Sequence, residues 1–242
     1  MIKEALEYIL DLKQPHFWTA ESGDVYADKR MSRVEQSYYP DALEVTNLTS
    51  LLAFIHSNDL MMQKLIVQIK SPNEVRLYST LDDDMKRDLY IIAKCPTAAF
   101  NFGVWQDSER FNIGVQANFV ENEDKTLLLK FAGTTESGTI STYDDDGVTQ
   151  KATIRTGVAS KGTALVPNPV KLRPYRTFAE VEQPESGFVF RMRQGSGVEC
   201  ALFEADGGTW KNEAMHNIQT FIENGLDTER LTELGRTVTI LS

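Results

Sequence analysis

The amino-acid sequence predicts an α+β fold, with mostly antiparallel sheets, flanking helices and a β-rich C-terminal half. Several segments repeat apolar residues every three or four positions, as amphipathic helices do. Others alternate apolar and polar residues on both sides of a short turn, which is the pattern of β-hairpins. No internal repeat or low-complexity linker interrupts the 242 residues. We therefore expect a single domain over residues 1–242, with two lobes divided near residue 134 as the alternative.

Six helices are expected, from apolar residues at helical spacing and from capping residues at the helix ends. Their expected ranges are 2–12, 48–55, 107–119, 125–133, 210–224 and 227–234. Thr46 or Asn47 can cap the second helix, and Asp107 can cap the third, because their side chains accept hydrogen bonds from free backbone N–H groups. Gly133 and Gly225 are placed to end the fourth and the fifth.

Strands are expected where apolar and polar residues alternate, or where a short apolar run lies between turn residues. Their expected ranges are 24–27, 42–46, 64–70, 74–79, 88–95, 138–143, 148–157, 163–167, 170–176, 188–194, 198–205 and 237–241. The turns 71–74, 144–147 and 195–197 join neighbouring strands into hairpins. Prolines place the segments 163–167 and 170–176 at sheet edges.

The composition excludes several classes of protein. The chain is 41% hydrophobic and 25% charged, as an ordinary globular protein is. Its apolar runs are far shorter than the roughly 20 residues of a membrane helix, and its first residues lack a secretory cleavage site. Cys95 and Cys200 are too few for a disulfide framework. We expect a soluble protein of a reducing cytoplasm, without membrane contact.

The net charge of −10 argues against a protein that binds duplex DNA, because such proteins neutralise phosphates with many Lys and Arg residues. An excess of acidic over basic residues usually keeps a protein soluble and indicates no further function.

Sequence motifs for catalysis are scarce. The chain has no phosphate-binding loop, no dinucleotide-binding turn and no nucleophile elbow, and its histidines are not paired at metal-ligand spacing. We therefore expect no cofactor and no metal, and we lean towards a protein that is not an enzyme. One alternative is a nuclease: Asp41, with Gln68 and Lys70 on a later strand, loosely resembles the PD-(D/E)xK arrangement that holds a divalent metal. Gln68 stands in place of the second acid, so one ligand is missing.

The stretch 171–194 is the candidate binding site, because it gathers cations and aromatic rings in an acidic chain. The candidate residues are Lys171, Arg173, Tyr175, Arg176, Arg191 and Arg193. In the strand 188–194, a period of two puts the Phe side chains on one face and Arg191 and Arg193 on the other. If the two cations of the preceding strand lie nearby, four cations converge and can bind a nucleotide-like anion through bidentate hydrogen bonds. Tyr175 could then stack on a base.

The same cations can instead be paired with neighbouring acids. Arg193 is expected opposite Glu199 across the hairpin turn, as a cross-strand ion pair. Glu180, Glu182 and Glu185 could neutralise the other cations of the stretch. An anion site and an ion-paired sheet face are therefore both open interpretations.

The order of several segments resembles that of a known family. A capped helix "TNLTSLLAFIHSN" precedes "VRLYS" and "YIIAKC", and "SERFNIGVQANF" with "LLLKFAG" leads into paired strands around "DDDG". A small-residue stretch then passes into a proline-containing strand in "ASKGTALVPNPVKLRPYR". This arrangement, over most of residues 45–225, resembles a phage and prophage family of unknown function that includes the prophage protein YfdQ. The resemblance implies a phage genome and an early or accessory gene, and it brings no established active site.

These observations lead to one main hypothesis and two alternatives. The main hypothesis is a non-catalytic phage accessory protein, a homo-oligomer that counteracts host antiviral defence by sequestering a nucleotide signal or by blocking a host defence protein. The first alternative is an accessory factor in phage recombination or replication that contacts single-stranded nucleic acid through Tyr175 and the basic stretch. The second alternative is the PD-(D/E)xK-like metal nuclease.

Overall fold

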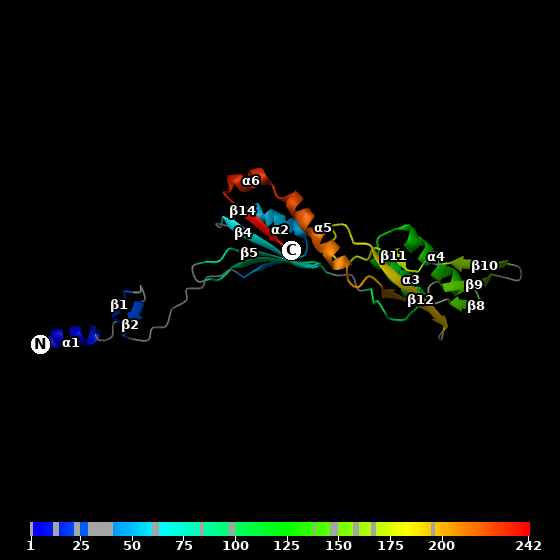
Figure 1. Ribbon diagram of the computed structural model, residues 1–242, viewed down its shortest axis with the longest axis horizontal. Coiled ribbons are helices and arrows are strands. Elements are labelled where there is room, and N and C mark those ends of the chain that lie inside the picture. The colour runs from blue at the N-terminus through cyan, green and yellow to red at the C-terminus, as the bar shows by residue number, and fades with distance from the viewer. Residues whose placement is uncertain are drawn as a thin grey trace. The chain divides into compact units, whose positions relative to one another are not determined.

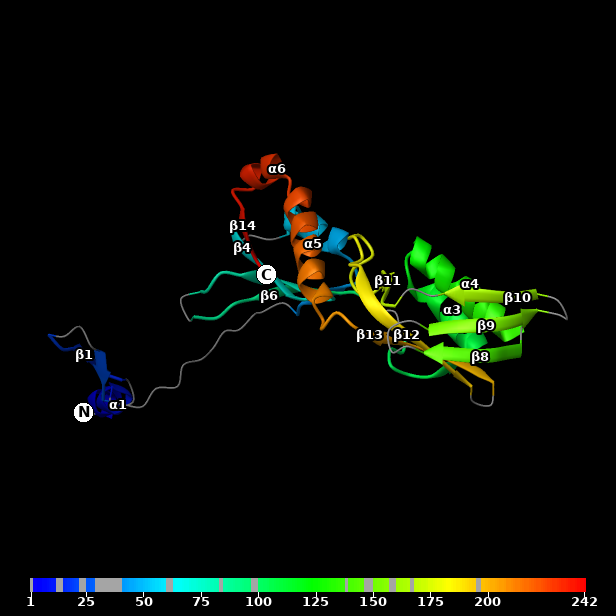
Figure 2. The ribbon, with the colours of Figure 1, turned by 45° about the vertical axis from the view of Figure 1, so that its right-hand side comes forward.

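The chain divides into two compact units, Met1–Tyr39 and Pro40–Ser242, which we describe separately. The computed structural model (Figures 1 and 2) describes residues 2–11, 15–21, 25–28, 41–59, 63–82, 85–96, 100–137, 139–145, 150–156, 160–165, 168–194 and 197–242. Its helices and mostly antiparallel sheets confirm the predicted α+β class. The single domain, or one divided near residue 134, stays a prediction.

The first unit contains the helix α1 (Ile2–Asp11) and a two-stranded antiparallel sheet of β1 (Phe17–Thr19) and β2 (Val25–Ala27). The helix and β2 were predicted, whereas β1 was not, because its three residues do not make a recognisable alternation. Large apolar side chains are exposed throughout its described part: Leu6, Tyr8, Ile9, Leu10, Phe17, Trp18, Val25 and Tyr26. A ten-residue helix and one small hairpin are too short to enclose a core.

The second unit contains a five-stranded sheet with the strand order β14-β4-β5-β6-β3. Its strands are β3 (Leu43–Val45), β4 (Lys64–Ser71), β5 (Glu74–Ser79), β6 (Leu89–Lys94) and β14 (Thr237–Leu241). The three central strands are antiparallel, which confirms the predicted hairpin and the predicted central strand, and both edge strands join in parallel.

Helices α2 (Leu48–Ile55) and α5 (Trp210–Gly225) pack on one face of this sheet, followed by the short α6 (Thr228–Glu233), as both views show. The Asn47 side chain caps α2 by accepting a hydrogen bond from the Ser50 N–H at 2.7 Å. Gly225 is the last helical residue of α5, not its cap. A Cβ at that position would collide with Leu52, so the glycine lets α5 approach α2.

The second unit also contains a four-stranded antiparallel sheet, β11-β12-β13-β7, and a core of its own. Its strands are β7 (Gln106–Asp107), β11 (Val170–Leu172), β12 (Ser186–Gln194) and β13 (Val198–Glu204). Helices α3 (Ser108–Asn118), capped by Asp107 as predicted, and α4 (Glu123–Ser137) contribute to its core. Phe190 of β12 lies 5.7 Å from Phe111 and 5.9 Å from Phe131, ring centroid to ring centroid.

The remaining strands form a three-stranded antiparallel sheet, with β9 (Gln150–Thr156) between β8 (Thr139–Asp145) and β10 (Ser160–Leu165). The pairing of β8 with β9 confirms the predicted hairpin. The first half of the predicted turn, residues 144 and 145, belongs to β8, and residues 146–149 lie outside the described part of the chain. The predicted end of α4 at Gly133 was wrong, because the helix continues to Ser137. One glycine inside a helix costs only about 1 kcal/mol, which neighbouring turns can offset.

Candidate binding surfaces

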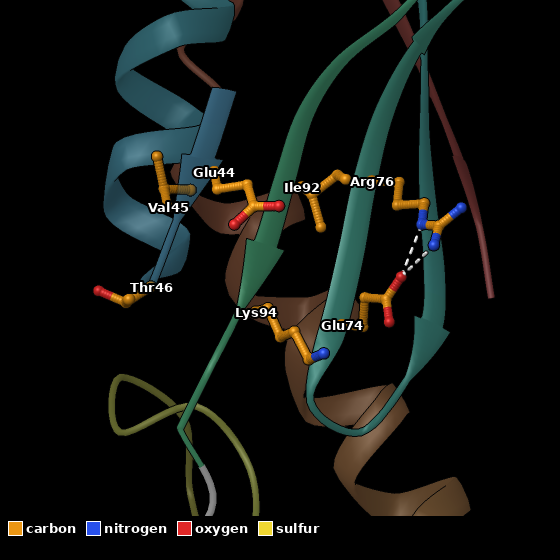
Figure 3. A pocket seen from close by; sticks show the side chains of 7 residues that line it. All are labelled: Glu44, Val45, Thr46, Glu74, Arg76, Ile92 and Lys94. Atoms are coloured by element: carbon orange, nitrogen blue, oxygen red, sulfur yellow. Dashed lines mark hydrogen bonds and ion pairs between the residues drawn. The ribbon is translucent and has the colours of Figure 1, made fainter. Parts of the chain in front are cut away.

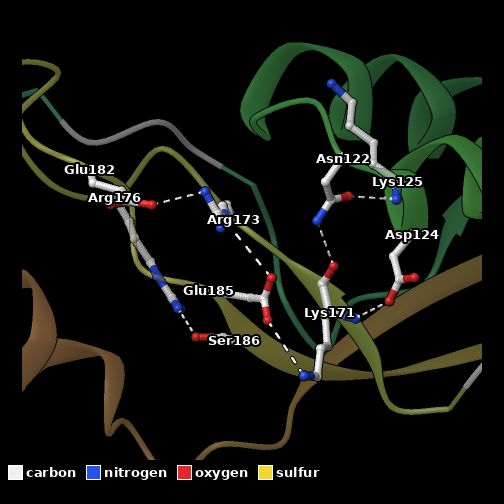
Figure 4. A network of polar contacts seen from close by, with 9 residues as sticks. All are labelled: Asn122, Asp124, Lys125, Lys171, Arg173, Arg176, Glu182, Glu185 and Ser186. Carbon is white, nitrogen blue, oxygen red and sulfur yellow. Dashed lines mark hydrogen bonds and ion pairs between the residues drawn. The ribbon is translucent and has the colours of Figure 1, made fainter.

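Lys171 and Arg173, the first two cations of the candidate stretch, contact three carboxylates (Figure 4). Lys171 Nζ is 3.7 Å from Glu185 Oε1, and the Lys171 N–H donates to Asp124 at 2.7 Å. Arg173 Nη1 is 3.0 Å from Glu182 Oε1, and its Nε is 3.8 Å from Glu185 Oε2. These contacts agree with the ion-paired interpretation for Lys171 and Arg173.

Arg176 is buried, with 8% of its surface exposed. Its guanidinium contacts Glu204 at 2.9 Å and Asp206 at 3.9 Å, and it donates a hydrogen bond to Ser186 Oγ. It also lies over the Trp210 ring, 3.9 Å from the ring centroid. Burial lowers the pKa of Arg176, and the nearby carboxylates of Asp206 and Glu204 oppose this effect. The side chain ties the loop before β12 to the start of α5, where a ligand has little access.

Arg191 and Arg193 project from the face of β12 that the sequence predicted, opposite the buried Phe residues. Arg193 pairs with Glu199 across the hairpin, as expected, with Nε 2.6 Å from Oε2. Its guanidinium lies 4.3 Å from the centroid of the Trp105 ring. Arg191 Nη1 donates to the Phe190 carbonyl at 3.0 Å.

The cations of the stretch therefore do not form one cluster. Lys171 is the register partner of Gly187, and Arg191 lies four residues farther along the same strand. At about 3.3 Å per residue, this separates the two backbones by roughly 13 Å. A ligand at these residues stays a prediction, and the geometry favours the ion-paired sheet face.

Tyr175 is 43% exposed and borders a hollow of about 720 Å³ at the start of α2. Other lining residues are Thr49, Cys95, Thr177 and Glu180. The Glu180 carboxylate accepts hydrogen bonds from the Thr49 N–H at 2.9 Å and from Thr49 Oγ1 at 3.0 Å. Burial raises the pKa of Cys95, which disfavours the thiolate. A fixed carboxylate beside a neutral thiol suits neither an anionic ligand nor nucleophilic catalysis.

The face of the five-stranded sheet opposite α2 and α5 carries more cations than carboxylates, and we call it the open sheet face. Strand alternation and register place on it Glu44, Lys64, Ile66, Gln68, Lys70, Glu74, Arg76, Tyr78, Ile92, Lys94, Thr237, Thr239 and Leu241. Four cations and two carboxylates lie on this face, in a chain whose net charge is −10. The local balance of charge is thus the reverse of that of the whole protein.

A hollow of about 440 Å³ lies on the open sheet face, lined in part by Glu44, Glu74, Arg76 and Lys94 (Figure 3). Arg76 directs Nε and Nη2 to a single oxygen of Glu74, Oε1, at 2.6 Å each. Lys70 Nζ lies 3.1 Å from the same oxygen. The sheet therefore holds two cations around one carboxylate at the border of the hollow.

Sequence reasoning missed the open sheet face, although a signal for it was present. Lys64, Lys70, Arg76 and Lys94 all fall at outward positions of segments that were predicted as strands. The sequence could not show that 64–70 lies beside the later strand β14 and that both helices pack on the same side. Without that arrangement, outward cations on separate strands are not recognisable as one surface.

The residues of the nuclease alternative lie apart. Asp41 precedes β3, whereas Gln68 and Lys70 belong to β4, and the strands β5 and β6 lie between them. Across the described ranges, no group of three His, Cys, Asp or Glu side chains is placed to hold a metal ion. This arrangement gives the PD-(D/E)xK alternative no support.

None of the helices in the described part of the chain is long and apolar enough to cross a bilayer. Comparisons with protein-family models, with curated proteins and with solved structures find no match for this chain. The resemblance to the phage family stays a prediction that rests on the order of the elements.

Proposed function

We propose that this protein is a non-catalytic binding protein that holds single-stranded nucleic acid on the open sheet face. The observation that carries the proposal is the excess of cations on this face of an acidic chain. If the resemblance to the phage family holds, the setting is phage recombination or replication in the cytoplasm of a bacterial host.

Charge and shape both support a single-stranded partner. Phosphate groups attract Lys and Arg side chains, and binding releases counterions from the strand. Tyr78 and Ile92 lie on the same face as the cations, so unpaired bases can stack on the Tyr78 ring or rest against the Ile92 side chain. A duplex keeps its bases stacked inside, so it would use the cations alone. Its higher charge density would also meet more repulsion from an acidic protein than a single strand meets.

We expect labelled oligo-dT to bind the full chain at low salt, with affinity that falls as salt rises. Lys64→Glu and Lys94→Glu should each weaken binding about tenfold, which corresponds to ~1.4 kcal/mol, because each reverses a charge that would contact a phosphate. Fluorescence anisotropy across a salt series measures both effects. We expect the logarithm of the affinity to fall by about 0.7 for each unit of log salt concentration and each phosphate contacted.

Two further variants with the same change of charge locate the surface. Lys211 belongs to α5, which covers the opposite side of the sheet. Lys211→Glu should therefore leave oligo-dT binding nearly unchanged. Lys171→Glu reverses a cation of the stretch that the sequence singled out. Loss of binding in Lys171→Glu, with binding retained in Lys94→Glu, would move the site to that stretch. Flat anisotropy for the unaltered chain at low salt would end the proposal.

A second candidate function is the blocking of a host protein or association with further copies of the chain. The exposed apolar side chains of the first unit favour it, since the described part of that unit has no core of its own. Sequestration of a nucleotide signal at residues 171–193 has less support, because most cations there contact carboxylates.

We expect native mass spectrometry of the full chain to report an assembly of more than one copy, and we expect Trp18→Glu to shift it towards one copy. Trp18 is 54% exposed, so the variant should not disturb the fold of the second unit. Leu241→Glu, at an exposed residue of the second unit, is the matched control. A single copy for the unaltered chain at micromolar concentration contradicts self-association and leaves a different protein as the partner.

A further inference from the structure

We propose that the Glu74 carboxylate occupies a phosphate-binding subsite formed by Lys70 and Arg76, and that a backbone phosphate of a bound strand displaces it. This inference rests on the proposed function, because it names the position at which the open sheet face receives one phosphate. It adds that the protein competes with its own ligand at that position.

The geometry is that of an anion held by two cations. Oε1 of Glu74 receives Arg76 Nε and Nη2 at 2.6 Å each and Lys70 Nζ at 3.1 Å. A guanidinium presents parallel N–H groups that fit carboxylate and phosphate oxygens equally well. A phosphate can offer separate oxygens to these donors, whereas Glu74 gathers them on one.

A strand irregularity and a neighbouring side chain help to position the two cations. The register of β4 and β5 shifts between Ile69 and Ser71, so Lys70 is the extra residue of a bulge beside Glu74. Such a bulge re-aims the side chains of the strand that carries it. Arg76 is held from its other side as well, because its Nη1 donates to Tyr78 Oη at 3.2 Å.

The subsite is accessible from solvent and opens onto the hollow of Figure 3. The side chains of Arg76 and Lys70 are 27% and 47% exposed, while that of Glu74 is 15% exposed. Lys94, the register partner of Glu74 on β6, lines the same hollow. Glu44 on β3 is the second carboxylate that lines this hollow. An incoming phosphate would therefore meet three cations once the Glu74 side chain has turned away.

The electrostatics agree with a site that favours negative charge. Burial raises the pKa of Glu74, but hydrogen bonds from Lys70 and Arg76 outweigh burial, and the pKa lies below its usual value. The hydrogen bonds to Tyr78 and Glu74 raise the pKa of Arg76. Removing the carboxylate leaves the two cations without this partner and available to a phosphate.

The test compares Glu74→Gln with Glu44→Gln in oligo-dT binding over a salt series. Both variants remove one negative charge from the same face, but only the first opens the subsite. We expect Glu74→Gln to raise affinity about fivefold and to steepen the salt slope by about 0.7, the value for one additional phosphate on a single strand. Glu44→Gln should raise affinity less and leave the slope unchanged. Equal gains with equal slopes in both variants would overturn the subsite.

A second measurement separates the subsite from the proposed function. Inorganic phosphate is titrated into unaltered protein and Glu74→Gln while the Arg76 Nε–H resonance is followed by NMR. We expect the resonance to move at lower phosphate concentration in the variant. Oligo-dT binding without any such movement retains the proposed function and removes the subsite. Movement without oligo-dT binding retains the subsite and removes the proposed function.

Discussion

Replacement of Arg176 by Ala is expected to lower the free energy of unfolding by about 3 kcal/mol, the lower end of the range for breaking a buried ion pair. The side chain is 8% exposed and bonds to Ser186 and Glu204, so its removal leaves polar groups of β12 and β13 without their charged donor. It also removes the contact with the Trp210 ring at the start of α5. Urea unfolding followed by circular dichroism measures the loss.

Arg193→Ala is the matched control, because Arg193 pairs with Glu199 at the surface and is 51% exposed. Exposed ion pairs contribute less than about 1 kcal/mol, so this variant should unfold close to the unaltered chain. Equal stability of the two variants would contradict a structural role for Arg176. It would return Arg176 to the list of ligand-binding candidates, where the sequence had placed it.

The stability difference caused by Arg176→Ala should shrink in acid. Burial raises the pKa of Asp206, but hydrogen bonds from Ser186 and Gly208 and the Arg176 charge outweigh it, and the pKa lies below its usual value. A carboxyl whose pKa is lowered by folding stabilises the folded state at pH values above its unfolded pKa of about 4. This stabilisation is lost as the pH falls through the lower pKa of the folded state. Urea midpoints in a series of pH values from 7 downwards compare the two proteins.

The local sequence pattern predicted most elements of the fold. It failed where contacts between residues distant in sequence determine whether an element forms or where it ends. The helix from Leu48 to Ile55 and the hairpin of β12 and β13 follow from capping, alternation and a turn that lie within a few residues. β7, of two residues, exists only because β13 pairs with it, and no local signal marks it. α4 passes Gly133 although that residue was expected to end it.

The candidate site also combines features that follow from the local sequence pattern with features that depend on contacts distant in sequence. Alternation correctly put Arg191 and Arg193 on the face opposite the Phe side chains, and it gave the partner of Arg193. It could not place Arg176, whose contacts with Glu204 and Trp210 cross 28 and 34 residues of sequence. The cations on the open sheet face come from three strands, and their proximity depends on strand order, which a single sequence does not give.

The two cores of the second unit permit a test of which sheet carries the function. Phe190→Ala is expected to lower the free energy of unfolding by about 3–5 kcal/mol, because it removes a fully buried ring from the core beneath β12. Phe190 contacts the rings of Phe111 and Phe131, and a truncated side chain leaves a cavity between α3 and α4. Thermal unfolding followed by circular dichroism measures this loss.

Binding should nevertheless survive in Phe190→Ala, at a temperature at which the variant remains folded. The open sheet face lies on the other sheet, whose core is formed by residues such as Leu77 and Ile91. Leu77→Ala is the matched control: Leu77 lies between Arg76 and Tyr78 on β5, fully buried, and its loss costs a comparable ~2–5 kcal/mol. It loosens the strand that presents the phosphate subsite, so oligo-dT affinity should fall in Leu77→Ala and stay unchanged in Phe190→Ala. If Phe190→Ala lost affinity for oligo-dT and Leu77→Ala kept it, binding would belong to the sheet of β12, because the two variants are destabilised by similar amounts.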